Sequence, residues 1–281
     1  PMTVRGLFQW AFIILLTLFV AVPFTLIGLL SPDRMAKGKI FRWLSKRYAG
    51  LAMRVFGVTV EARGLSRVDP GTGYVFMSTH ASHLDSPALA LALPQPTFWV
   101  FKKELAKIPF FGWTLLALGQ VMIDRSNARQ ARESMEEALR GLRGNLSILI
   151  YPEGTRSPDG KLQPLKKGGF HLAIRGKMPI VPVRVAGSHE LLPKGALTVR
   201  PGRVVVELFD PIPTEGKAEE DIPELMDRVR AALRYVWRDR PLLLALLAVS
   251  TVGFASDPSI TLTPSLAEEL GGGTHLVGLL S

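Results

Sequence analysis

A histidine and an aspartate five positions apart are the side chains whose spacing points most directly to chemistry. His80 and Asp85 lie between two apolar runs, Tyr74–Met77 before them and Ala88–Leu93 after them. This pattern predicts a buried strand, a sharp turn and a helix, with His80 at the strand end and Asp85 at the first turn of the helix. A carboxylate there can hold one imidazole tautomer and stabilise the ring when it accepts a proton. The pair therefore predicts a general base, and an Asp that only caps the helix is the structural alternative.

A second group of polar side chains follows another apolar run. Directly after Ser147–Ile150 the sequence supplies a carboxylate, a glycine, a hydroxyl and a guanidinium, at Glu153, Gly154, Thr155 and Arg156. Open α/β sheets bind ligands beyond their strand ends, glycine lets a backbone approach a ligand, and the planar arginine suits a phosphate. We therefore expect an anion site here, extended by the lysines between positions 161 and 167. A charged surface turn with a Glu153–Arg156 ion pair is the structural alternative.

Two further basic residues follow predicted strands. Arg125 comes after the apolar run Val121–Ile123, and we expect it to converge on the same anion. Lys103 comes after Thr97–Phe101, where a lysine or a backbone amide could face a developing oxyanion. Each of the two is equally compatible with a solvated strand end.

The composition narrows the class of partner. The formal net charge is +10 and the isoelectric point is about 10.1, which indicates an anionic partner such as a phosphate, a nucleic acid or an anionic lipid. The chain has no cysteine, which excludes disulfides, thiolate catalysis and cysteine–zinc sites. A mean hydropathy of +0.22 is high for so basic a chain, and this suggests a membrane segment.

The segment Leu7–Leu30 carries no charged residue and is long enough to enter a bilayer, whose core needs about 20 residues. Pro23 and Gly28 allow a kink or a re-entrant hairpin instead of a clean span, so we predict insertion without choosing its form. The basic residues that follow would keep the next domain on the cytoplasmic side of the membrane. Between Ile40 and Val55, apolar residues at helical spacing predict a helix that lies on an anionic membrane, packs on the domain, or does both.

From about residue 57, strands and helices alternate. This predicts an α/β fold with a mixed sheet flanked by helices, preceded by the N-terminal membrane-inserted helical segment. The expected strands are Val58–Ala62, Tyr74–Thr79, Thr97–Phe101, Val121–Ile123, Ser147–Tyr151, Ile180–Val185 and Val204–Phe209. The expected helices are Pro87–Leu93, Glu104–Leu118, Ala128–Leu142, Gly169–Arg175 and Ile222–Arg238. We divide the chain into residues 1–56, an α/β domain at 57–241, and an apolar stretch and tail of unknown role at 242–281.

Together, these motifs resemble the glycerophospholipid acyltransferase superfamily, and most of all its bacterial 1-acyl-sn-glycerol-3-phosphate acyltransferase type. Four blocks carry the resemblance, in the family's order, across roughly residues 34–215. They are His80-x4-Asp85, Gly119 to Arg125, Pro152 to Arg156, and Ile180-Val181-Pro182-Val183. The first and third blocks, each after a predicted strand, are the specific part of the signal.

The resemblance implies roles for individual residues. His80 and Asp85 would be the catalytic dyad, and lysophosphatidate would be bound by Glu153, Gly154, Thr155 and Arg156 with help from Arg125. Pro182 would shape the side that binds the acyl donor. Two positions depart from the family pattern, because Thr79 stands where Asn is usual and Tyr151 where Phe is usual, and the second change is expected to be benign.

The implied reaction moves a fatty acyl group from an acyl thioester to the 2-hydroxyl of lysophosphatidate at a lipid bilayer. Acyl-CoA or acyl carrier protein would be the co-substrate, with no cofactor and no metal, and glycerol 3-phosphate or another lysolipid is an alternative acceptor. A metal hydrolase that uses His80, His83 and Asp85 is one rival. A basic protein that only binds a membrane or a nucleic acid is another, although the sequence has no nucleic-acid motif and we expect no nucleic-acid partner.

Overall fold

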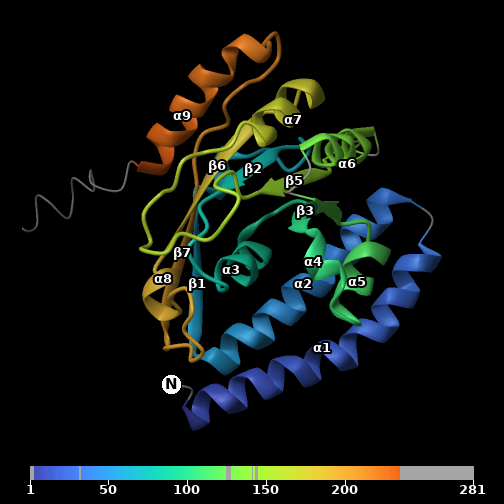
Figure 1. The fold of residues 1–281 in the computed structure, drawn as a ribbon, viewed down its shortest axis with the longest axis vertical. Helices are drawn as coiled ribbons and strands as arrows, with labels where there is room; N and C mark the ends of the chain where they lie inside the picture. The colour runs from blue at the N-terminus through green and yellow to red at the C-terminus, as the bar shows by residue number, and fades with distance from the viewer. Residues whose placement is uncertain (1–2, 32, 125–127, 141, 143–144, 235–281) are drawn as a thin grey trace, which may run out of the picture. The chain divides into compact units, whose positions relative to one another are not determined.

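The computed structural model describes residues 3–31, 33–124, 128–140, 142 and 145–234 (Figure 1). The apolar stretch and tail predicted for 242–281 lie outside the described residues, as does the end of the helix predicted for Ile222–Arg238. Residues up to Arg234 form one compact unit, so the N-terminal helices belong to the same unit as the sheet. The domain boundary between residues 56 and 57 therefore stays a prediction from composition.

Seven strands of the described chain form one sheet in the order β1-β7-β6-β2-β5-β3-β4. β6 and β7 are antiparallel and all other neighbours are parallel, so the predicted mixed sheet is confirmed. Every predicted strand is present, with ends shifted by at most two residues. The strands are β1 Val58–Arg63, β2 Val75–Ser78, β3 Thr97–Lys102, β4 Val121–Ile123, β5 Ser147–Ile150, β6 Ile180–Ala186 and β7 Gly202–Leu208.

The strand order brings the sequence motifs to one edge of the sheet. β2, β5, β3 and β4 are consecutive neighbours and parallel, so their carboxyl ends face the same way. The residues that follow these strands are those that sequence analysis selected. β6 is parallel to β2 on its other side, so the segment after Ala186 reaches this edge as well.

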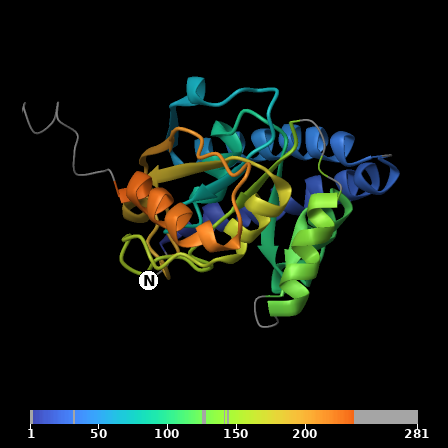
Figure 2. The same ribbon diagram turned by 90° about the horizontal axis from the view of Figure 1, so that it is seen from above.

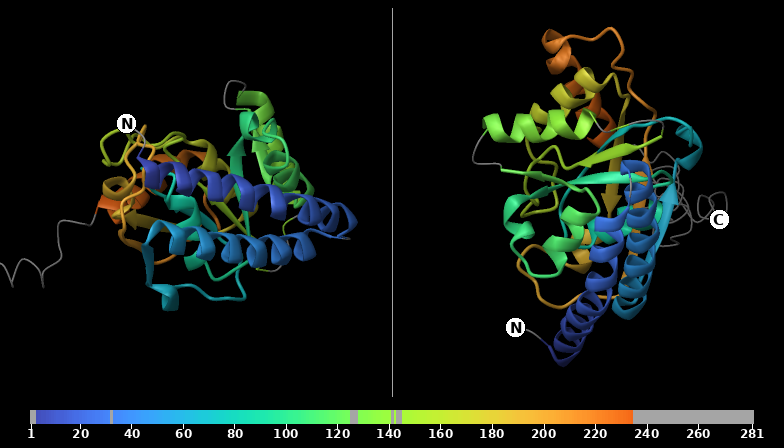
Figure 3. Two further views of the ribbon diagram at one scale, coloured as in Figure 1. Left: turned by 90° about the horizontal axis from the view of Figure 1, so that it is seen from below. Right: turned by 90° about the vertical axis from the view of Figure 1, so that its right-hand side faces the viewer.

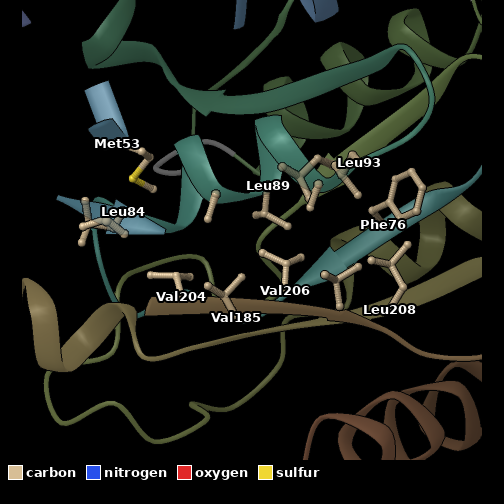
Figure 4. Packing of buried hydrophobic residues seen from close by; sticks show 14 of the residues in the cluster. Met53, Phe76, Leu84, Leu89, Leu93, Val185, Val204, Val206 and Leu208 are labelled. Atoms are coloured by element: carbon tan, nitrogen blue, oxygen red, sulfur yellow. The ribbon is translucent and has the colours of Figure 1, made fainter. Parts of the chain in front are cut away.

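Helices cover both faces of the sheet (Figure 2), and successive residues of a strand point to opposite faces. In β2, Phe76 belongs to a core cluster with α2 (Arg34–Phe56) and α3 (Asp85–Ala92). Val75 and Met77 belong to a second cluster with α6 (Ala128–Arg140), α7 (Gly168–Gly176) and α9 (Ile222–Arg234). Figure 4 shows the first cluster, in which Leu89 of α3 faces Val206 of β7. These two apolar layers fix the strands and hence the edge that carries the motifs.

Most predicted helices are present: α3 Asp85–Ala92, α6 Ala128–Arg140, α7 Gly168–Gly176 and α9 Ile222–Arg234. The single helix predicted for Glu104–Leu118 is wrong. It is two short helices, α4 Lys103–Ala106 and α5 Phe111–Ala117, because Pro109 interrupts the helical backbone and Phe110 has a φ of 65°. The sequence patterns do not predict α8 Ser188–Leu191 or the 3-10 turns η1 Leu65–Arg67 and η2 Glu219–Asp221.

The N-terminal segment forms two helices, α1 Val4–Leu30 and α2 Arg34–Phe56, which run side by side (Figure 3). The apolar side of α2, which includes Phe41, Leu44 and Met53, is buried against the domain. Packing on the domain is thus confirmed for α2, and this leaves its basic side available to a membrane.

α1 is long and apolar enough to cross a membrane, and only 11% of its most apolar window is buried. Both of its ends nevertheless contact the domain. Near the amino end, the indole of Trp10 donates to the Leu197 carbonyl at 2.7 Å. Near the other end, the hydroxyls of Thr25 and Thr114 lie 3.0 Å apart, and Gly28 packs so closely on α5 that an added Cβ would lie 2.9 Å from Ala117. α1 therefore lies along the domain over its length.

Candidate active site

The turn after β2 holds the predicted His–Asp pair in direct contact. His80 Nδ1 lies 2.9 Å from Asp85 Oδ2, and the Asp85 side chain is fully buried. The same oxygen accepts the backbone amides of Ala81 at 2.7 Å and Ser82 at 2.8 Å. Leu84 is the N-cap of α3, with no side-chain capping bond. The carboxylate therefore folds back onto the turn and the imidazole, and the helix-capping alternative is wrong.

The contact with Asp85 fixes the tautomer of His80. An ionised carboxylate only accepts hydrogen bonds, so Nδ1 carries the ring proton and Nε2 keeps its lone pair. Among the described residues, Nε2 has no hydrogen-bond partner. The imidazole is partly exposed, at 18%, which suits a group that must meet a substrate.

Thr79 connects this turn to the neighbouring strand β6 by hydrogen bonds. Its backbone amide donates to the Val183 carbonyl at 3.1 Å, and its hydroxyl accepts the Val185 amide at 2.9 Å. The residue that departs from the family pattern thus serves as an anchor between β2 and β6. Pro182, which the resemblance assigns to the donor side, is buried inside β6 beside Met77 of β2.

Glu153 joins the β2 turn to the loop after β5. Its carboxylate is 3% exposed, and its two oxygens accept the backbone amides of His80 and Gln163, each at 2.8 Å. Burial raises the pKa of this carboxyl to about 6, although the two amide hydrogen bonds pull it down. Both oxygens are occupied by amides, so Glu153 is placed to hold the loops together, and the described residues show no ion pair between it and Arg156.

Arg156 lies beside the same turn. The amide of the next residue, Ser157, donates to the His80 carbonyl at 2.7 Å. Desolvation first, and then the charge of Arg156, lower the pKa of His83. Arg156 is half-buried, and its guanidinium has no acidic partner in the described part of the chain. It is therefore free to receive an anion.

Two lysines contact the loop that carries Arg156. The loop can pass close to Lys166 because Gly154 has a φ of 72° and no side chain; a Cβ there would lie 2.9 Å from the Lys166 ammonium. The Lys194 ammonium donates a hydrogen bond to the Arg156 carbonyl at 3.3 Å. Thr155 is exposed in the same loop. The structure thus adds Lys194 to the predicted basic residues, and no sequence spacing indicated it.

Lys103 is a predicted site residue that the structure does not bring to His80. The Lys103 ammonium pairs with the Asp124 carboxylate, and this hydrogen bond raises the pKa of Lys103. β5 lies between β3, which precedes Lys103, and β2, which precedes His80. Arg125 lies outside the described residues.

The structure gives no geometric support to the metal-hydrolase alternative. Within the part of the chain that the structure describes, no three His, Asp or Glu side chains converge as a metal site requires. The ring of Tyr151 lies against the His80 imidazole, a contact that the sequence does not predict.

The fold and the site define an α/β protein with a His–Asp pair beside a basic loop at the carboxyl edge of its sheet. The family model described as Acyltransferase matches residues 59–186, from β1 to the end of β6. An uncharacterized acyltransferase from Schizosaccharomyces pombe is 32% identical over 192 residues, which are 67% of this chain and 69% of that protein. The chain therefore belongs to the acyltransferase family, a family of enzymes, and the resemblance inferred from the sequence blocks is confirmed.

Other relatives have more specific names. A protein from Cocos nucifera named 1-acyl-sn-glycerol-3-phosphate acyltransferase is 34% identical over 201 residues, or 70% of this chain. The chain spans 63% of the length of that relative, slightly less than two thirds. The crystal structure of the 1-acyl-sn-glycerophosphate (LPA) acyltransferase PlsC from Thermotoga maritima covers 83% of this chain and 95% of its own, with 26% identity and a TM-score of 0.68.

Proposed function

We propose that this protein transfers a fatty acyl group from an acyl thioester to the 2-hydroxyl of lysophosphatidate at a membrane, which yields phosphatidate. The observation that carries the proposal is the 2.9 Å contact between His80 and the buried Asp85, beside the loop of Arg156, whose guanidinium has no acidic partner among the described residues. The names of the Cocos and Thermotoga relatives favour this acceptor over glycerol 3-phosphate or another lysolipid. Acyl-CoA and acyl carrier protein both supply the required thioester, and the chemistry needs no cofactor.

His80 acts as the general base in this proposal. Nε2 takes the proton of the acceptor hydroxyl while its oxygen attacks the thioester carbonyl, and Asp85 stabilises the imidazolium that forms. When the tetrahedral intermediate collapses, the carbon–sulfur bond breaks and the imidazolium returns its proton to the departing thiolate. No acyl-enzyme forms, and Ser82 is unsuited to be a nucleophile because its buried hydroxyl donates to the Leu192 carbonyl at 2.8 Å.

Arg156 binds the acceptor phosphate in this proposal, and Thr155 and Gly154 line the loop beside it. Two roles differ from those the resemblance implies. Glu153 positions the His80 backbone instead of touching the phosphate, since a carboxylate repels phosphate and both of its oxygens are occupied. Lys103 remains a candidate oxyanion donor only if Asp124 releases it, and Arg125 stays a prediction.

We also propose that α1 attaches the enzyme to a membrane by lying along the surface. Its outward side exposes large apolar residues, among them Leu15 at 67% and Phe19 at 82%, and α5 adds Trp113 at 51%. The helix is about 40 Å long, and both of its ends contact the domain. If it crossed the bilayer, α5 and the segment around Leu197 would enter the hydrocarbon with it. The cytoplasmic side stays a prediction from the positive-inside bias.

The decisive experiment is an acyl-transfer assay on membranes with a panel of lyso-acceptors. We expect His80→Ala to lower the rate about 1,000-fold while membrane association is unchanged. His171→Ala is the matched control, because His171 lies on α7 and contacts Glu219 instead of the site. A protein that only binds membranes would have no activity to lose, and a stoichiometric metal in the purified protein would favour the hydrolase.

A further inference from the structure

The ring of Tyr151 stacks on the face of the His80 imidazole. The two ring centroids are 3.8 Å apart, and the ring planes differ by 15°, which is a face-to-face stack. The Tyr151 hydroxyl lies 3.0 Å from the hydroxyl of Ser86, the second residue of α3. Burial raises the pKa of the Tyr151 hydroxyl, so it remains neutral at physiological pH.

We propose that Tyr151 is a positioning residue for catalysis: its ring holds the plane of the His80 imidazole so that Nε2 faces the acceptor hydroxyl. This inference rests on the proposed function, in which His80 is the base.

Two contacts together leave the imidazole one orientation. The hydrogen bond from Nδ1 to Asp85 favours one side-chain torsion of His80, but a hydrogen bond can bend, so the ring plane can still tilt. The Tyr151 ring limits this tilt, because an imidazole turned out of its plane would collide with the aromatic face. A misdirected base loses rate steeply, since proton transfer depends on the alignment of donor and acceptor.

The stack also acts on the charged state of His80. The face of an aromatic ring carries partial negative charge, so it attracts the imidazolium that forms when Nε2 accepts the proton. Tyr151 is itself held by Ser86, the residue after Asp85, so the start of α3 supports both contacts with the imidazole. The ring therefore contributes to the transition state more than to substrate binding.

Three kinds of variant separate the ring from its hydroxyl. Tyr151→Leu and Tyr151→Met remove the ring, and we expect kcat to fall about tenfold or more with little change in either KM. Tyr151→Phe keeps the ring and should retain kcat within about threefold. Ser86→Ala removes the partner of the hydroxyl and should resemble Tyr151→Phe. Thermal unfolding of each variant checks that the losses do not come from misfolding.

A spectroscopic readout tests the stack without substrate. Protons above an aromatic face resonate upfield, so in protein with ¹³C-labelled histidine one of the five histidines should show upfield ring signals, and His80→Gln should remove them. Tyr151→Phe should keep this shift, whereas Tyr151→Leu should abolish it.

The outcomes distinguish this inference from the proposed function. Full kcat in the Leu and Met variants, an equal loss in the Phe variant, or the absence of the upfield signals would each overturn the positioning role. If the wild type transfers no acyl group while the upfield signals persist, the proposed function fails and the stack is only a structural contact.

Discussion

One oxygen of Asp85 serves three donors, while the other, Oδ1, is buried without a hydrogen-bond partner among the described residues. An unsatisfied buried acceptor costs free energy, typically about 1–3 kcal/mol, and such groups are kept mainly where they serve a function. Here the arrangement concentrates the negative charge beside the His80 imidazole. In the proposed mechanism, the carboxylate would offset the positive charge that the imidazole gains when it accepts the proton.

Arg156 is the residue whose role can be separated from the chemistry by kinetics. We expect Arg156→Ala to raise the KM for lysophosphatidate roughly 10- to 100-fold, because a charge-assisted hydrogen bond to phosphate is lost. The KM for the acyl thioester should change little. Initial rates measured with each substrate varied in turn test this, with Arg228→Ala as the control because Arg228 pairs with Glu224 on α9. Equal increases in both KM values would contradict the assignment of Arg156 to the phosphate site.

The loop after β5 and the turn after β2 are joined by hydrogen bonds into one structural unit. Glu153 accepts one amide from each side, and the Ser157 amide donates to the His80 carbonyl. The neighbouring parallel strands bring the two segments together, and these polar contacts then set their spacing. The position of the imidazole relative to Arg156 therefore depends on a buried carboxylate.

The buried carboxyl of Glu153 predicts a specific pH dependence of stability. Its pKa rises from 4.5 to about 6 on folding, so its contribution to stability is complete below pH 4.5 and is lost as the pH rises through about 6. The loss amounts to about 2 kcal/mol. Glu153→Gln has no such step. The free energy of unfolding of the wild type, relative to the variant, should thus fall by about 1.5 kcal/mol between pH 4.5 and 7, since part of the loss has already occurred at pH 4.5.

Urea unfolding of both proteins at pH 4.5, 5.5 and 7 measures this difference. Groups that titrate in both proteins cancel, and the hydrogen bond that glutamine fails to make adds a constant offset. A difference that does not change with pH would contradict the burial of Glu153.

The sequence predicted the elements well because strands buried on both faces appear as short apolar runs, such as Ser147–Ile150. It also predicted the pairing of His80 with Asp85, since five positions across a turn leave little freedom. The contacts between different strand ends could not be predicted: His80 as a partner of Glu153, and Asp124 as the partner of Lys103, depend on strand order. The interruption of the helix at Pro109 could have been predicted from the sequence, because proline cannot continue a helix.

At the scale of the molecule, an apolar surface lies on the side where α1 packs on α2 and α5. α1 contributes most of the exposed apolar residues, and Leu116 of α5 extends the surface. Exposed apolar area of this extent is typical of an interaction surface, since the removal of each large apolar side chain from water contributes about 1.5–3 kcal/mol. A helix that lies in the membrane plane and a helix that spans the bilayer would each bury this area, but they leave the ends of α1 in different places.

Because the chain has no cysteine, single thiols can locate both ends of α1. Val4→Cys marks the first residue of the helix, and Ser31→Cys marks the position after the last. With protein bound to the outside of sealed vesicles, a membrane-impermeant maleimide should label both variants to similar extents, because an in-plane helix keeps both ends on one side. A spanning helix would protect one thiol until detergent opens the vesicles, since about 30 Å of hydrocarbon would separate the ends. Protection of either thiol would therefore contradict the in-plane arrangement and indicate a helix that spans the bilayer. In that case α5 and the segment around Leu197 would have to move away from α1.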